Sequence, residues 1–99
     1  MEAWRTAITD TGAGYIRLRG YDVTELMRHA SFADVLFLLH RSRLPSPDER
    51  RLLDAILIAS SDHGPGSPSA LAARVVASGN RRAPEAAIAA GLLAIGDYH

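Results

Sequence analysis

The chain has 99 residues, 47% of them hydrophobic, and a mean hydropathy near zero, which is typical of one soluble globular domain. Its 11 basic residues balance its 11 acidic ones. This balance argues against a nucleic-acid-binding protein, which concentrates a basic surplus on one face. Cysteine is absent and every basic residue is an arginine, which excludes disulfides, a thiol nucleophile, thiolate metal ligands and a lysine Schiff base.

The amino-terminal segment has no targeting pattern. The first ten residues, MEAWRTAITD, include an early acidic residue and no apolar core of the kind that a signal peptide needs. The longest apolar run, Ala86 to Ile95, has ten residues, against roughly 20 for a membrane-spanning helix. We therefore expect a cytoplasmic protein.

The first third of the chain predicts a small hairpin and a short helix. Strand-forming residues occupy Trp4 to Thr9 and Tyr15 to Leu18, and Asp10 to Gly14 between them predicts a turn. The run Asp22 to Glu25 has the pattern of a capping box, which opens a helix to about His29.

Two further helices follow. Ser31 with Asp34 opens one that runs to about His40. Residues 46–49, SPDE, combine an N-cap, a proline at the first helical position and an N3 glutamate, and this helix runs to about Ser61. Both helices carry apolar residues at helical spacing.

The last 40 residues predict a helical hairpin. Ser67 and Pro68 start one helix, which stops near Gly79. A second helix starts near residues 82–85 and runs to about Ile95. Each helix is roughly 17 Å long, and such a short connection predicts antiparallel neighbours. Matched lengths should return Asp62 and His63, before the hairpin, and residues 97–99, after it, to the same end.

The second helix of this hairpin is apolar on every face from Ala86 to Ile95. A helix of this kind is expected to be buried on all sides. A chain of 99 residues has few elements that could surround it. The pattern therefore predicts that a partner or further sequence covers the helix.

The residues most able to carry chemistry lie at the end where the hairpin closes. Asp62-His63-Gly64-Pro65-Gly66 turns into a helix N-terminus, whose unpaired N–H groups favour an anion such as a carboxylate. The structural alternative is that Asp62 and His63 only finish the preceding helix and that His99 is a mobile end. A capping role suffices for His29 and His40, and Tyr98 is expected in the core or at its rim.

Six motifs occur in order along the chain: Asp10-Thr11-Gly12, Arg19-Gly20-Tyr21-Asp22, SFADVLFLLHRSRLPSPDE, DHG, AARVVAS and AIAAGLLAIGDYH. With this ordered set, the sequence from Trp4 to His99 resembles the N-terminal part of the citrate synthase family, and most closely its short citryl-CoA lyase members. The segments DHGP and GLLAIGD also resemble the citrate-cleaving module of ATP-citrate lyase.

The resemblance implies roles for two histidines. The family's first motif histidine, which hydrogen-bonds oxaloacetate or citrate, matches His63. The histidine that closes the second motif, normally followed by Gly-Gly-Ala, matches His99, and it polarises the acetyl-CoA thioester and supplies the enol proton. The implied reaction is Claisen-type carbon–carbon bond formation or cleavage between acetyl-CoA and oxaloacetate, part of tricarboxylic acid metabolism. His63 and His99 are then the catalytic residues, acetyl-CoA or CoA is a substrate, and neither a bound cofactor nor a metal is implied.

The resemblance also implies that residues 1–99 are an incomplete domain. The family's catalytic aspartate, second substrate histidine, substrate-binding arginines and most of its CoA-binding surface follow the position of His99. The expected fold is mainly α, a fragment of the helical large domain with a small N-terminal β-hairpin. The fragment alone should be inactive, and the full-length protein is expected to be a homo-oligomer that binds citryl-CoA, oxaloacetate and acetyl-CoA but neither nucleic acid nor membrane.

Two other classes of function stay open. A metal-dependent hydrolase could use Asp62, His63, Asp97 and His99 as mixed carboxylate and imidazole ligands for zinc or iron. A non-catalytic helical module of the same fold could use the apolar helix from Ala86 to Ile95 to form an oligomer.

Overall fold

The computed structural model describes residues 4–99, so the first three residues, on which the prediction of no signal peptide partly rests, lie outside it. The chain divides into two compact units, Met1–Ala59 and Ser60–His99. Each unit packs chiefly on itself, and the one domain expected from composition stays a prediction.

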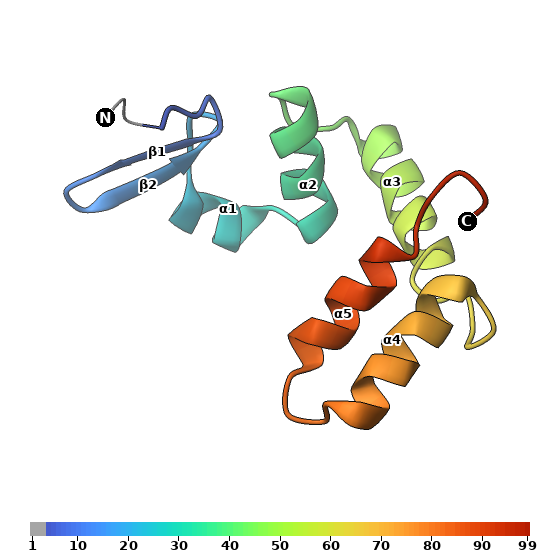
Figure 1. Ribbon diagram of the computed structural model, residues 1–99. Helices are drawn as coiled ribbons and strands as arrows, with labels where there is room; N and C mark the ends of the chain where they lie inside the picture. The colour runs from blue at the N-terminus through green and yellow to red at the C-terminus, as the bar shows by residue number, and fades with distance from the viewer. Residues whose placement is uncertain (1–3) are drawn as a thin grey trace. The chain divides into compact units, whose positions relative to one another are not determined.

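Residues 4–99 form three short strands and five helices, and Figure 1 labels all of them except β3. The fold is mainly helical with a small sheet at the N-terminus, as predicted. The bounds of the elements are β1 Thr9–Gly12, β2 Tyr15–Leu18, β3 Tyr21–Asp22, α1 Val23–His29, α2 Phe32–Arg41, α3 Pro47–Ala59, α4 Pro68–Gly79 and α5 Pro84–Leu93.

The first strand begins later than predicted. β1 and β2 pair antiparallel, with Thr9 opposite Leu18 and Gly12 opposite Tyr15. The turn between them is therefore only two residues long, and its second residue, Gly14, has φ of 81°. Because a two-residue turn suffices, residues 10–12, predicted as turn, pair in the ladder instead.

A third strand, which was not predicted, follows a second tight turn. Arg19 and Gly20 have φ of 50° and 88°, the pattern of a type I′ hairpin turn. The Arg19 guanidinium donates to the carbonyl of Leu39 through Nε at 3.3 Å and Nη2 at 3.0 Å, and to the carbonyl of Ala7 through Nη1 at 3.3 Å. One side chain thus joins the sheet to the end of α2.

The predicted starts of α1 and α2 are confirmed by their caps. The Asp22 carboxylate accepts hydrogen bonds from the backbone N–H groups of Thr24 and Glu25. Glu25 does not complete a capping box there, because its carboxylate pairs with Arg28 at 2.9 Å and with His29 at 3.5 Å. At α2 the box is complete, since Ser31 and Asp34 each accept from the backbone N–H of the other.

The buried centre of the first unit is small. Leu26, Ala33 and Leu38 are its buried apolar residues, and Asp34 is buried beside them with Arg50 at 3.6 Å. The predicted apolar face of α3 contributes no buried residue. This unit therefore depends strongly on its polar contacts.

The second unit is the predicted antiparallel hairpin, and Figure 1 shows α4 and α5 side by side. A Cβ added to Gly91 would lie 3.3 Å from the carbonyl oxygen of Ser69 and 3.5 Å from the Cβ of Ala73, so glycine permits the close approach. α5 ends before Ile95, because the N–H groups of residues 94 and 95 donate to carbonyls only three residues back, which tightens the last turn.

The expectation that α5 is buried on every side is not met by residues 4–99. Ala87 is its one buried residue, whereas Ile88, Leu92 and Leu93 are 64%, 63% and 87% exposed. α4 covers one side of α5, and the remaining apolar surface is open. Within the described part of the chain no helix is both long and apolar enough to cross a membrane.

We predict that Glu49 makes the first unit sensitive to acid. Hydrogen bonds from the Arg43 guanidinium at 2.7 and 2.8 Å, supported by the backbone N–H of Ser46, lower the pKa of Glu49 from 4.5 to about 2. Because the pKa is lower in the folded state, the carboxylate stabilises the fold above pH 4.5, and this contribution is lost as the pH falls toward 2. Glu49→Gln should lower the melting temperature at pH 7 and flatten its fall between pH 4.5 and 2.

Circular dichroism across this pH range checks the prediction. Asp48→Asn is the matched control, because Asp48 lies on the same turn and contacts Arg51 through one oxygen, whereas Glu49 binds Arg43 through both carboxylate oxygens. If the melting temperature of Glu49→Gln fell as steeply between pH 4.5 and 2 as that of the unchanged chain, the stabilising role assigned to the Glu49 carboxylate would be contradicted.

We also predict that Gly91 sets the separation of α4 and α5. Gly91→Leu should destabilise the hairpin by about 1–3 kcal/mol, because the added side chain meets the backbone of Ser69. Urea unfolding measures the change. Ala89→Leu, at an exposed position of the same helix, is the control and should cost much less. Equal stabilities of the two variants would show that the helices are not in close contact at Gly91.

Candidate functional site

The site is built on the turn that enters α4. The Asp62 carboxylate accepts from the backbone N–H of Gly64 at 3.1 Å, and Gly64 has φ of 80°, a conformation that favours glycine. Ser67 is the N-cap, and its hydroxyl accepts from the backbone N–H of Ala70 at 3.3 Å. The predicted turn and helix start are confirmed, and they place His63 beside the N-terminus of α4.

The His63 ring contacts the turn and the cap. Its Nδ1 lies 3.3 Å from the carbonyl oxygen of Gly64, and because a carbonyl only accepts, Nδ1 carries the hydrogen in this contact. The Ser67 hydroxyl lies 3.2 Å from Nδ1 and 3.4 Å from Nε2, so it faces the ring edge between the two nitrogens. The Ser67 hydroxyl can also donate to Nδ1, and in that arrangement the Nε2–H of His63 can donate to a ligand.

The other histidine returns to the same helix end. Gly96 and His99 exchange two backbone hydrogen bonds, at 3.1 and 3.0 Å, which close a turn after α5. The Nε2 atom of His99 lies 3.2 Å from the backbone nitrogen of Ser69 and 2.8 Å from its hydroxyl oxygen. This N–H is one of the helix N-terminal donors that has no partner within the helix.

The contact with Ser69 decides the tautomer of His99. A backbone N–H can only donate, so Nε2 of His99 must accept with its lone pair. In a neutral ring the hydrogen is then on Nδ1. His99 therefore presents Nδ1–H as a hydrogen-bond donor to any group that binds beside it.

The predicted convergence of the two ends of the hairpin is confirmed. The ring centroids of His63 and His99 are 6.2 Å apart, with the planes at 61°. Ser69 lies between them, with its hydroxyl 3.4 Å from Nε2 of His63. Both rings are exposed, so a ligand could reach them. The pair can offer donors to a carboxylate or a carbonyl oxygen beside the positive end of the α4 dipole.

Ser69 was missed by the sequence-based predictions. It follows the cap and proline of α4, six positions after His63, where a hydroxyl has no obligatory role in forming a helix. Its importance comes from a contact with His99, which is 30 residues away. One feature of the sequence could have pointed to Ser69: it lies in the first turn of the helix that begins just after His63.

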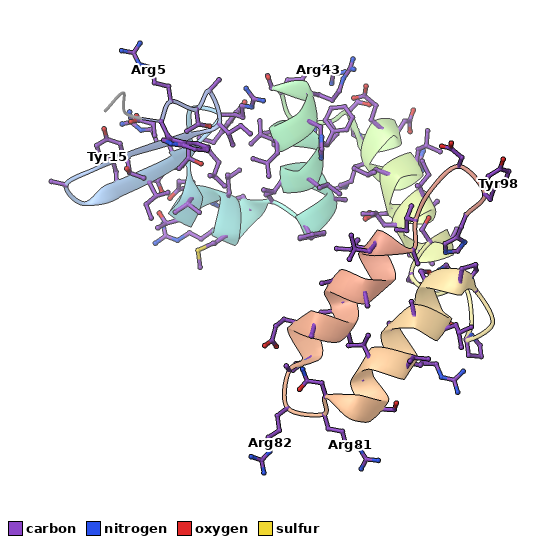
Figure 2. All side chains as sticks on the ribbon, in the orientation of Figure 1. Arg5, Tyr15, Arg43, Arg81, Arg82 and Tyr98 are labelled. Atoms are coloured by element: carbon purple, nitrogen blue, oxygen red, sulfur yellow. The ribbon has the colours of Figure 1, made fainter. Side chains whose placement is uncertain are left out.

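Other predicted residues stay outside the cluster. Tyr98, expected in the core or at its rim, is fully exposed, and Figure 2 shows its side chain extending from the terminal turn. His29 pairs with Glu25 at 3.5 Å in the first unit. His40 lies in the last turn of α2 and is exposed, and its capping role stays a prediction.

The proposed metal ligands do not form a metal-binding group. No set of three or more histidine, aspartate or glutamate side chains within residues 4–99 is placed to hold an ion. Asp62 is instead occupied with its turn. The alternative of a metal-dependent hydrolase therefore loses its geometric basis in this part of the chain.

A cavity of about 320 Å³ in the first unit lies apart from these histidines. Its charged groups include Asp34 and Arg50, which already pair with each other. Its remaining wall is largely apolar, with Leu26 and Leu44 among the lining residues. Two more of its polar groups, Glu25 and His29, also pair with each other, and we assign the cavity no function.

Two sequence comparisons each match part of the chain. Residues 1–51 match the family model described as citrate synthase, C-terminal domain. Citrate synthase of Corynebacterium glutamicum is 48% identical over 40 residues, which are 40% of this chain and 9% of that protein.

Solved structures are similar over nearly the whole chain, including the residues around His63 and His99. Citryl-CoA lyase from Hydrogenobacter thermophilus matches with a TM-score of 0.90 and 39% identity, over 99% of this chain and 38% of that one. Two ATP citrate lyases match with a TM-score of 0.83 and 22% identity, over 97% of this chain and 16% of theirs, which shows the fold alone. They are from Methanosaeta concilii, in complex with (3S)-citryl-CoA, and Methanothrix soehngenii, in complex with citrate and coenzyme A.

The chain thus spans less than two fifths of each of these relatives. The family model covers the first half of the chain, and the lyase structure covers nearly all of it. On these matches, the chain belongs to the citrate synthase family.

Proposed function

We propose that this chain supplies part of the active site of a citryl-CoA lyase or citrate synthase-type enzyme. The reaction is Claisen-type cleavage or formation of a carbon–carbon bond between acetyl-CoA and oxaloacetate. The observation that carries the proposal is the meeting of His63 and His99 at the N-terminus of α4. Two imidazoles beside a helix N-terminus suit a substrate that carries both carboxylates and a thioester.

His99 acts on the thioester. Its Nδ1–H donates to the thioester carbonyl oxygen, where negative charge develops when the enol forms. The hydrogen bonds from Ser69 hold the ring from its other side. A donor oriented in advance needs no rearrangement during the reaction, and it stabilises the enol in both directions.

His63 holds the carboxylate substrate. In condensation the enol carbon attacks the ketone of the oxaloacetate bound there, and in cleavage the same bond breaks and its electrons return to the thioester side. The methyl proton is removed by a base that lies beyond the described residues. Acetyl-CoA or citryl-CoA is the substrate, and the proposal requires no further cofactor.

The similarity to citryl-CoA lyase supports this assignment, because it extends over the whole histidine cluster. The ATP citrate lyases of the same fold contain citryl-CoA, or citrate with coenzyme A. These ligands combine carboxylates with a CoA group, the two features that the proposed roles of His63 and His99 require.

We further propose that residues 1–99 are the N-terminal part of a longer domain, cytoplasmic and homo-oligomeric when complete. The chain spans 38% of the citryl-CoA lyase, and the open apolar surface of α5 needs a cover. We predict that the source locus continues in frame after His99, beginning Gly-Gly-Ala. Sequencing the locus checks this, and a genuine stop codon would contradict it.

We predict that the 99-residue chain alone does not cleave citryl-CoA. Activity should appear when the chain is extended by the part of the Hydrogenobacter thermophilus lyase that it does not cover. In that extended protein His99→Ala should lower kcat by about 10²–10³, because it removes a donor to the enol oxygen. His63→Ala should chiefly raise KM for the carboxylate substrate. The rate of acetyl-CoA release at increasing substrate concentration gives both kcat and KM.

His29→Ala and His40→Ala are the matched controls, since these histidines lie in the first unit, outside the cluster, and both variants should retain turnover. Turnover by the 99 residues alone would contradict the proposed extent of the domain. Full activity of His99→Ala would contradict the role of His99.

The open surface of α5 also favours a second candidate, a non-catalytic module of the same fold that forms an oligomer. Ile88, Leu92 and Leu93 are all more than half exposed, and an interface between copies could cover them. Analytical ultracentrifugation of the 99-residue chain distinguishes the oligomeric module from a piece of a larger domain. A defined oligomer with cooperative unfolding supports the module, whereas partial folding or aggregation supports a piece of a larger domain.

A further inference from the structure

The hydrogen bond made by the Asp62 side chain spans His63. The carboxylate oxygen Oδ1 of Asp62 accepts from the backbone N–H of Gly64 at 3.1 Å, so the bond closes a ring that contains the backbone of His63. This is an Asx turn, in which a side chain takes the place of a backbone carbonyl. The ring restricts both backbone rotations of His63, and these rotations decide the direction in which its imidazole leaves the chain.

The chain after His63 is restricted as well. Gly64 has φ of 80°, which favours glycine, and Pro65 limits the conformations of the residue before it. The carbonyl oxygen of Gly64 lies 3.3 Å from Nδ1 of His63, so the turn also supplies a contact for the ring. The turn thus holds the His63 ring where its centroid is 6.2 Å from that of His99.

Asp62 reaches the two histidines only through this turn. None of the ion pairs within residues 4–99 joins Asp62 to His63 or His99, and the carboxylate makes its one hydrogen bond in this part of the chain to Gly64. Its negative charge repels a carboxylate substrate. The hydrogen bond and the charge of Asp62 therefore have opposite effects on substrate binding, and variants can separate them.

We propose that Asp62 is a positioning residue for His63, an inference that rests on the function proposed above. Without the bond to Gly64 the His63 backbone rotates more freely, and the imidazole spends less time where the carboxylate substrate meets it. His99 is held independently, because the backbone N–H of Ser69 fixes its ring from α4. Loss of the Asp62 bond should therefore weaken substrate binding and leave the step at the thioester intact.

The test uses the extended protein described above and the KM for citryl-CoA. Asp62→Ala should raise KM about 2–10-fold, the range expected for one hydrogen bond, with little change in kcat, as for a lost interaction that ground state and transition state share. Asp62→Glu keeps the charge but moves the acceptor farther from the backbone, so it should raise KM as Asp62→Ala does. Asp62→Asn removes the charge but keeps the acceptor, so it should not raise KM.

A double-mutant comparison shows whether Asp62 acts through His63. In the His63→Ala background, Asp62→Ala should have no further effect on KM, because no imidazole is left to position. An equal effect in the two backgrounds would show a structural role alone and would overturn the proposal.

Asp22→Ala is the matched control. The Asp22 carboxylate accepts from the backbone N–H of Thr24 at 2.8 Å, which is the same bond to the residue two positions later. It lies in the first unit and spans Val23 instead of a histidine. Asp22→Ala should therefore leave the KM for citryl-CoA unchanged.

The outcomes separate this inference from the proposed function. If His63→Ala raises KM and Asp62→Ala does not, the positioning role is overturned and the proposed function stands. If Asp62→Asn raises KM as much as Asp62→Ala, the effect comes from the charge, and the positioning role is again overturned. If His63→Ala leaves KM unchanged, the proposed binding role of His63 fails, and the positioning role fails with it.

Discussion

The backbone N–H of Ser69 donates to Nε2 of His99 across 30 residues of sequence, and the chemistry proposed for this chain depends on that contact. It uses a donor that every helix N-terminus leaves without an internal partner. It also decides which nitrogen of His99 carries the hydrogen. A histidine placed here without this contact could present either nitrogen to the thioester, and only one of the two tautomers would donate from Nδ1.

The packing of the hairpin and the geometry of the site meet at the same residue. Gly91 of α5 lies against the carbonyl of Ser69, while the N–H of Ser69 holds His99. A larger side chain at position 91 would therefore move the helix N-terminus that organises both imidazoles. The close approach of α4 and α5 is thus a requirement of the site as well as of the fold.

The distribution of apolar surface explains why activity is assigned to a larger protein. Fully burying one leucine or isoleucine side chain is worth roughly 1.5–3 kcal/mol, and α5 leaves several of them exposed. The first unit likewise has few buried apolar residues. This exposed apolar surface supports the proposal that residues 1–99 are part of a larger domain.

The sequence by itself determined the helix starts and the meeting of His63 with His99. Caps such as Ser31 and Ser67 act within four residues, and the equal lengths of two helices are visible in the residue pattern, so both are local information. Only the tertiary structure decided the tautomer of His99, the part played by Ser69 and the exposure of α5. Each of these depends on contacts between residues far apart in the chain, and no pattern of caps or periodicity encodes such contacts.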